Sequence, residues 1–210
     1  MEIKLKNVSK KIDGVDIIKD VNIVLESGHI YGFIGRNGSG KTMLLKMICG
    51  FIKPSIGEIL LNNNDIYKKN FFTDDIKALI ESPKFINDLS GFDNLKLLAG
   101  IQKKITDNDI EEWLKKFGLF SEKDKLYSKY SLGMKQKIGI IQVLMENPNV
   151  IILDEPFNGL DEKSVKIVKK ILKTEKNNGK LIIISSHIKE DIDYLCDIKV
   201  KFENGMIKLN

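Results

Sequence analysis

Apolar residues recur along the chain with two different periods, and each period predicts a different kind of element. Alternating or short continuous runs rich in β-branched residues predict strands, because strand side chains alternate between two faces. Such runs occupy residues 2–8, 17–25, 29–34, 58–61, 76–80, 150–153 and 181–184. A helical period appears at residues 43–48, in segments between residues 90 and 146, and at residues 165–172. Two last runs, 198–202 and 206–209, flank Asn204-Gly205 and predict a closing hairpin.

The order of these elements predicts the architecture. Strands and helices alternate at both ends of the chain, whereas the middle is helical, and alternation of this kind favours a mostly parallel sheet covered by helices. We therefore expect an α/β fold in which residues 1–82 and 147–210 form the core. Residues 83–146 would form a helical subdomain inserted into that core. A chain of 210 residues is long enough to be one such domain with a full hydrophobic core.

Composition narrows the class of protein further. Hydrophobic residues make up 42% of the chain and charged residues 30%, which excludes a wholly disordered or membrane-embedded protein. No apolar run approaches the roughly 20 residues that span a bilayer, and the first residues do not resemble a signal peptide. Cys49 and Cys196 are too few for a disulfide framework, so we expect reduced, buried thiols in a cytosolic protein. The net charge of +5 comes from interspersed lysines, which favours a solvated surface over a nucleic-acid interface.

The strongest chemical signal is a phosphate-binding loop of eight residues, Gly35-Arg36-Asn37-Gly38-Ser39-Gly40-Lys41-Thr42, which matches G-x-x-x-x-G-K-[ST]. The loop follows a buried strand and opens a helix, which is the context the motif requires. Glycines let successive backbone N–H groups surround phosphate oxygens, and the helix N-terminus adds partial positive charge. We expect Lys41 to reach the outer phosphates and Thr42 to supply a hydroxyl ligand to Mg²⁺. The alternative is a chance glycine-rich turn, which the flanking elements disfavour.

A second signal follows the apolar strand at residues 150–153. Asp154, Glu155 and Pro156 stand at its C-terminal end, where open α/β sheets bind ligands. One carboxylate, Asp154, can hold Mg²⁺, and the next, Glu155, can polarise an attacking water molecule. Alone these residues could form a surface turn, but together with the phosphate loop they predict nucleotide hydrolysis, with Glu155 and Lys41 as catalytic residues.

Three further motifs follow in a characteristic order: Tyr130-Ser131-Leu132-Gly133-Met134-Lys135-Gln136, Asn158-Gly159-Leu160-Asp161 and Ser185-Ser186-His187. With these five elements the chain resembles the ATP-hydrolysing subunits of ABC transporters over nearly its whole length. The resemblance implies a P-loop NTPase (RecA-like) core with a mixed sheet, an N-terminal antiparallel β-subdomain and the inserted helical subdomain. It also implies ATP and Mg²⁺ as cofactors.

The resemblance assigns roles to four more residues. Ser131, Gly133 and Asp161 would contact ATP that a second subunit holds, so that two copies bind head to tail. His187 would contact the γ-phosphate and help to orient the water molecule, as a further catalytic residue. Each has a simpler structural alternative, since Ser131 and Asp161 could be helix N-caps and His187 an ordinary polar strand end.

The partners that the resemblance implies are a second ATPase subunit, most simply in a homodimer, and integral membrane permease subunits. The permeases would hold the protein at the inner face of the cell membrane, and nucleic acid is not expected as a partner. The expected docking surface follows Glu81 and contains Phe85, Ile86, Leu89 and Phe92, more apolar side chains than a solvated loop needs.

The sequence departs from the family pattern at three places, in the signature motif, at the expected Mg²⁺ site and at the expected adenine contact. Leu132 and Met134 replace a usual Gly and a usual Gln in the signature motif. Glu81 stands at the strand end where the family usually has Gln, and its carboxylate is expected to face Mg²⁺. Ile12 stands where an aromatic side chain usually stacks on adenine, so an apolar contact with the base is expected without stacking.

The signature motif, together with Leu79-Ile80-Glu81-Ser82-Pro83, resembles the branch that exports peptide antibiotics such as bacitracin and lantibiotics. That likeness implies export of a peptide antibiotic or drug, with immunity or resistance as the result. Two other classes remain as alternatives, an ABC-type ATPase that acts on nucleic acid or the ribosome and a P-loop small-molecule kinase. The first usually carries a second cassette or a long coiled-coil insert, and the second gives no reason for Ser131, Gly133 and Asp161.

Overall fold

The computed structural model describes residues 1–68 and 74–209. Its strands are β1 (Glu2–Ile12), β2 (Val15–Glu26), β3 (Ile30–Ile34), β4 (Ile56–Leu61), β5 (Asn64–Asp65), β6 (Ile76–Leu79), β7 (Val150–Asp154), β8 (Leu181–Ser186), β9 (Ile198–Glu203) and β10 (Met206–Leu209). Its helices are α1 (Lys41–Ile48), α2 (Gly91–Gln102), α3 (Asp107–Lys116), α4 (Leu132–Leu144), α5 (Glu162–Asn177) and α6 (Lys189–Leu195), with short 3₁₀ turns η1 (Phe120–Glu122) and η2 (Tyr127–Lys129).

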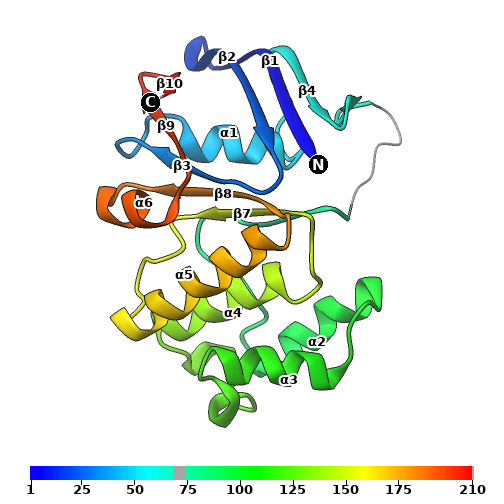
Figure 1. Cartoon of the computed structure of the whole chain (residues 1–210). Coiled ribbons are helices and arrows are strands. Elements are labelled where there is room, and N and C mark those ends of the chain that lie inside the picture. The colour runs from blue at the N-terminus through cyan, green and yellow to red at the C-terminus, as the bar shows by residue number, and fades with distance from the viewer. Residues whose placement is uncertain (69–73, 210) are drawn as a thin grey trace.

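The strands form two sheets that lie one above the other (Figure 1). The smaller sheet has the order β2-β1-β4-β5 and is antiparallel. The larger has the order β10-β9-β3-β8-β7-β6, and its neighbours pair in parallel except for β9 and β10. The mixed sheet, the antiparallel β-subdomain and the hairpin across Asn204-Gly205 are therefore confirmed.

The larger sheet is covered on both faces, which is why its central strands read as continuous apolar runs. All six residues of β8 are buried. Its side chains alternate between two cores, one on each face of the sheet. Leu181 and Ile183 belong to the core on the side of α1, the upper core, and Ile182 and Ile184 to the core on the opposite side, the lower core.

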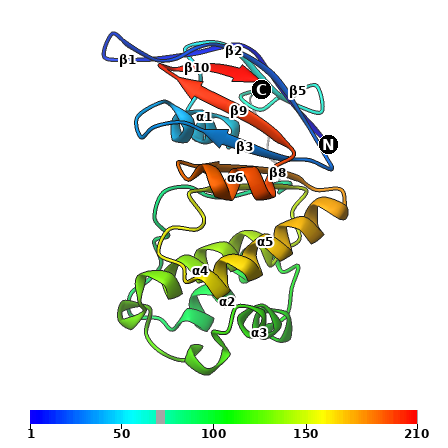
Figure 2. The same ribbon diagram turned by 60° about the vertical axis from the view of Figure 1, so that its left-hand side comes forward.

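The upper core lies between the larger sheet, α1 and the antiparallel sheet, and the lower core lies between the larger sheet and the remaining helices (Figure 2). Leu95 from α2, Ile110 from α3 and Ile138 from α4 belong to the same buried cluster as Ile151 of β7. The helices within the expected 83–146 segment thus share their core with the sheet. No helix in the described part of the chain is long and apolar enough to cross a bilayer.

Cys49 and Cys196 are both free thiols, and each is partly rather than fully buried. Burial raises the pKa of each thiol to about 12. Both side chains are therefore protonated thiols at neutral pH. Because the thiolate is the reactive form of cysteine, neither side chain is activated as a nucleophile.

Candidate active site

The phosphate loop connects β3 to α1, and its backbone geometry requires glycine at one central position. Gly40 has a φ of 106°, and a Cβ atom there would lie 2.6 Å from Ile18 Cδ1 and 3.1 Å from the carbonyl oxygen of Ile17. Gly40 is the N-cap residue of α1, and the helix has no side-chain cap and no acidic residue in its first turn. Its first N–H groups therefore have no side-chain acceptor, which is the arrangement that binds phosphate at helix N-termini.

Lys41 is a buried cation at the first position of α1. Its side chain closes back on the loop, where Nζ donates to the carbonyl oxygens of Gly35 at 2.7 Å and Arg36 at 3.2 Å. The residue is only 6% exposed, and no described carboxylate lies within 4.0 Å of Nζ. A buried charge without a counter-ion is costly, so this site fits an anionic ligand such as the phosphates of ATP.

Asp154 lies at the end of β7 and receives two hydroxyl hydrogen bonds. Thr42 Oγ1 donates to Oδ2 at 2.8 Å, and Ser185 Oγ donates to Oδ1. Carboxylate and hydroxyl oxygens are the ligands that Mg²⁺ prefers, so Thr42 and Asp154 fit the metal assigned to them. No three His, Cys, Asp or Glu side chains within residues 1–68 and 74–209 form a metal-binding group. Any metal here would thus take hydroxyl, water or nucleotide oxygens besides Asp154.

Glu155 has one carboxylate oxygen held and the other without a partner. Oε2 lies 2.8 Å from His187 Nδ1, whereas Oε1 is buried with no hydrogen-bond partner among the described residues. The backbone is held in a left-handed conformation, with φ of 49°, and its N–H donates to the carbonyl and hydroxyl oxygens of Ser185. Gln136 Nε2 donates to the carbonyl oxygens of Glu155 and Pro156, at 3.3 and 3.2 Å. The signature motif contains Gln136 but does not predict its contact with this turn.

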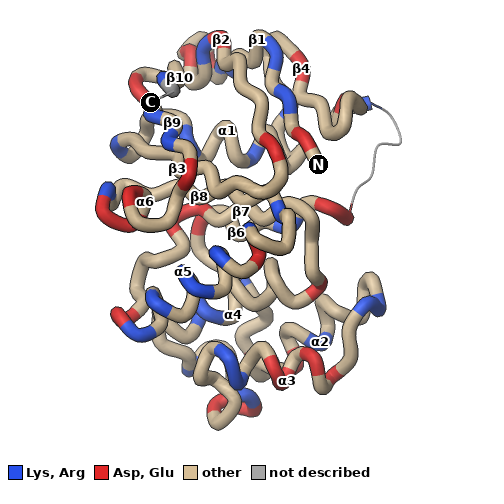
Figure 3. Tube along the Cα trace, viewed as in Figure 1, with Lys and Arg blue, Asp and Glu red and all other residues tan. Residues whose placement is uncertain are grey.

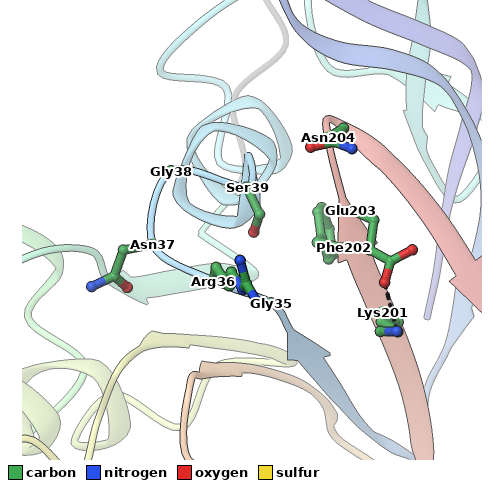
Figure 4. A pocket seen from close by; sticks show the side chains of 9 residues that line it. All are labelled: Gly35, Arg36, Asn37, Gly38, Ser39, Lys201, Phe202, Glu203 and Asn204. Atoms are coloured by element: carbon green, nitrogen blue, oxygen red, sulfur yellow. Dashed lines mark ion pairs between the residues drawn. The ribbon is translucent and has the colours of Figure 1, made fainter.

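Two cavities lie against the phosphate loop. One, of about 430 Å³, is lined by residues 37–43 together with Ile17 and Glu155. The other, of about 520 Å³, separates residues 35–39 from Lys201–Asn204 on the β9–β10 hairpin, and Figure 4 shows these two segments facing each other. Ile12 lines neither cavity and lies at the exposed end of β1. Ile17 lines the first of these cavities instead. Sequence reasoning missed it, because nothing in its local sequence distinguishes it.

The signature motif and the turn at residues 158–161 form a second group of expected site residues. Ser131 caps α4, with Oγ accepting from the Met134 N–H, and Asp161 caps α5, accepting from the Ser164 N–H. The simpler capping roles of both side chains are therefore confirmed. Gly133 contacts the turn so closely that a Cβ atom would lie 2.6 Å from the carbonyl oxygen of Gly159.

Glu81 follows β6 and forms an ion pair with the phosphate-loop helix. Its carboxylate lies 2.5 Å from Nζ of Lys46, one turn beyond Thr42 on α1, and its side chain is 63% exposed. The hydrogen bond and charge of Lys46 lower the pKa of the Glu81 carboxyl. In the described structure Glu81 has no hydrogen bond to Thr42 or Asp154, so its expected position on Mg²⁺ stays a prediction.

Comparison with known proteins agrees with this arrangement. Residues 18–158 match the family model described as ABC transporter. A Bacillus subtilis protein named as an uncharacterized ABC transporter ATP-binding protein, YybJ, is 40% identical over 98% of this chain and 94% of its own length. The bacitracin transport ATP-binding protein BcrA of Enterococcus faecalis is 37% identical over 93% of this chain, which spans 64% of that relative.

A solved structure described as the ATP-binding subunit of an ABC transporter superposes with a TM-score of 0.89 at 27% identity. The alignment covers 99% of this chain and 88% of the solved one. The family match covers more than half of the chain, and the fold and the phosphate site agree with it. The chain therefore belongs to the ABC transporter family, as an ATP-binding ATPase subunit of the kind that works with membrane permease subunits.

Proposed function

We propose that this subunit powers the export of a peptide antibiotic or drug through membrane permeases, giving the cell immunity or resistance. The observation that carries the substrate class is the likeness to BcrA, a bacitracin transport protein, over 93% of this chain. The signature motif and the Glu81 segment resemble the same branch. Attachment to permeases would place the protein at the inner face of the cell membrane.

In the proposed hydrolytic step, Glu155 is the general base. Its Oε1 is buried and has no hydrogen-bond partner among the described residues, so this oxygen would accept the proton once ATP and the attacking water molecule occupy the site, while Oε2 pairs with His187. Lys41 and the first N–H groups of α1 bind the phosphates, and Thr42 and Asp154 hold Mg²⁺. The metal supplies charge neutralisation at the transferred phosphate.

Two subunits would complete each ATP site. Ser131 supports this part of the proposal, because its Oγ accepts from the Met134 N–H while its own O–H remains a donor. The residue is exposed at the start of α4, so a phosphate held by a second subunit can approach it. Gly133 and Asp161 would contact the same ATP from neighbouring positions, and ATP binding would close the homodimer.

Permease docking would use the segment after Glu81 and the adjoining face of α2. Ile86 is 49% exposed, and on α2 Leu97 is 55% and Ile101 75% exposed. Phe85 and Phe92 are only partly buried against the lower core. This exposed apolar surface begins four residues after the Lys46–Glu81 ion pair, so docking and the phosphate-loop helix are linked through a short stretch of chain.

Antibiotic susceptibility tests the substrate class directly. The subunit and the permeases of its gene cluster are expressed in a sensitive host, and the inhibitory concentrations of bacitracin and of a lantibiotic are measured. We expect the wild-type subunit to raise at least one of them and the Glu155→Gln variant, expressed equally, to raise neither. Unchanged susceptibility with a wild-type subunit that hydrolyses ATP would contradict the substrate class and leave the ATPase assignment standing.

A further inference from the structure

A groove of about 610 Å³ lies between helices α5 and α6 and shares no lining residue with the cavities at the phosphate loop. Lysines recur along α5, whose tube shows repeated blue segments in Figure 3. We call this the α5–α6 groove and define it by Leu160, Val165, Lys166, Lys170, Lys173 and Tyr194. No residue with a proposed role in hydrolysis, dimer contact or permease docking lines it, although Leu160 precedes Asp161 in the turn at residues 158–161.

The two ends of the groove differ in chemistry. Leu160 and Val165 form an apolar end next to the first turn of α5. At the other end Tyr194 is 64% exposed, and Nζ of Lys173 lies 3.9 Å from the centroid of its ring. Between them Lys169 is neutralised by Asp191 at 2.7 Å, and both side chains are only 15% exposed. This ion pair fixes α6 against α5 and keeps the groove in shape.

The remaining lysines of the groove form no ion pair with a described residue. In the part of the chain that the structure describes, no carboxylate lies within 4.0 Å of Lys166, Lys170 or Lys173. They stand at positions i, i+4 and i+7 of α5 and therefore share one face of the helix. Like charges at this spacing repel one another, so an anionic partner would relieve an unfavourable interaction.

We propose that the α5–α6 groove binds an acidic segment of a partner protein, with its carboxylates on Lys166, Lys170 and Lys173 and an apolar side chain over Leu160 and Val165. Charge complementarity selects an anionic partner, and the apolar end selects among anions. A nucleic-acid backbone is charged throughout and offers no apolar side chain for that end, where the carboxylate of Glu162 also lines the groove. A bilayer surface is broad, whereas this site is recessed between two helices.

Fluorescence anisotropy with a labelled peptide tests the proposal. The probe is Leu-Leu-Gly-Glu-Glu-Glu-Glu, titrated with the full chain at low and at high salt. We expect saturable binding that weakens with salt and that falls at least about tenfold in Lys170→Glu/Lys173→Glu, since charge reversal opposes the same interaction. The matched control is Lys53→Glu/Lys103→Glu, which makes the same charge change at exposed positions outside the groove. Circular dichroism establishes that both variants are folded.

Two additional probes separate the contributions. Replacing the peptide's leucines with serine should weaken binding, and Tyr194→Ala should weaken it where Tyr194→Phe does not. The proposal is overturned if no saturable binding occurs up to about 1 mM, the weak end of specific affinities. It is also overturned if the control variant loses as much affinity as the groove variant. Tighter, groove-dependent binding of a single-stranded oligonucleotide or of phosphatidylserine vesicles would assign the groove to a different class of partner.

Discussion

Helices α1 and α4 both begin at residues expected to contact ATP, but their first turns are completed in different ways. Helix α1 starts at Gly40 with no side-chain cap, so its leading N–H groups are left for a ligand. Helix α4 starts at Ser131, whose Oγ already accepts from the Met134 N–H. The first helix has no side-chain acceptor at its start, whereas the second has one of its leading N–H groups satisfied by a side chain.

The charged groups beside the two helix starts also differ, and again in a way that favours phosphate at α1. Beside α1 lies the buried Lys41 ammonium, bonded only to neutral carbonyl oxygens. Beside α4, Asp161 caps α5, and its carboxylate lies 4.0 Å from Nζ of Lys137 on α4. Phosphate binding should therefore be strong at α1 in one subunit alone, while α4 can only add to a phosphate that α1 already holds.

We expect the largest effect from a variant that binds ATP but cannot hydrolyse it. In that variant α1 of one subunit and α4 of the other would both contact the same intact ATP. Glu155→Gln removes the proton acceptor and should reduce turnover by about 10²-fold or more, the usual contribution of a general base. ATP affinity should stay unchanged, and light scattering should show a dimer with ATP but not with ADP. Near-normal turnover would contradict the role of Glu155.

Closing the open start of α1 should have the next largest effect. Gly40→Ala forces a side chain into a left-handed conformation and against Ile18, so we expect ATP affinity to fall about 100-fold, or ~3 kcal/mol. Gly14→Ala is the matched control, because Gly14 has a φ of 80° but nothing within 4 Å of its Cβ position. Calorimetric titration should show that the control binds ATP with an affinity close to that of the wild type. Equal losses in both variants would mean that general backbone strain is responsible.

The cap on α4 can be separated from its proposed contact with ATP. Asp is as good an N-cap as Ser, so Ser131→Asp should keep stability within about 0.5 kcal/mol, whereas Ser131→Ala should lose about 1 kcal/mol. In the Glu155→Gln background, Ser131→Asp should abolish the ATP-dependent dimer, because its carboxylate repels phosphate. Urea unfolding and light scattering measure the two effects independently. A dimer that survives in Ser131→Asp would contradict the composite site.

The smallest effect concerns the ion pair that joins α1 to the segment before α2. Since Lys46 lowers the folded-state pKa of Glu81, the pair stabilises the protein above the unfolded pKa of Glu81 and stops doing so as pH falls through its lowered folded value. Glu81→Gln should therefore change the free energy of unfolding by less than about 1 kcal/mol at neutral pH and by nothing at low pH.

The proposed coupling role of Glu81 gives the same residue a second test. ATP hydrolysis by Glu81→Gln should stay comparable to that of the wild type, because the amide keeps an oxygen ligand. Glu81→Ala should lower antibiotic resistance more than it lowers the ATPase rate of the isolated subunit. Full resistance in Glu81→Ala would show that the residue has no part in coupling.

The sequence predicted the layers of the fold because periodicity reports which faces are buried. It underestimated β1 and β2, which continue to Ile12 and from Val15 as an exposed hairpin. There the strands pair through their backbones, at Lys11 with Asp16 and at Ile12 with Val15, and residues 11–16 are all exposed, so no buried face produces an apolar pattern.

The site residues that belong to sequence motifs could be predicted, whereas those outside the motifs could not. The motifs identified Thr42 and Asp154, and the structure joins them with a hydrogen bond. The contacts of Ile17, Gln136 and Lys46 were not predictable, because they connect segments that only the tertiary fold brings together. Their residue types are ordinary at those positions, so no local signal distinguishes them.

The alternation of β8 side chains between the two cores has a consequence for folding cooperativity. A strand that serves both cores cannot leave one without exposing the other, so neither half of the molecule can unfold as an independent unit. Trp113 is the single tryptophan and packs against the lower core, which makes its fluorescence a reporter of that half. Its denaturation curve should coincide with that of the far-ultraviolet circular dichroism, as one all-or-none transition.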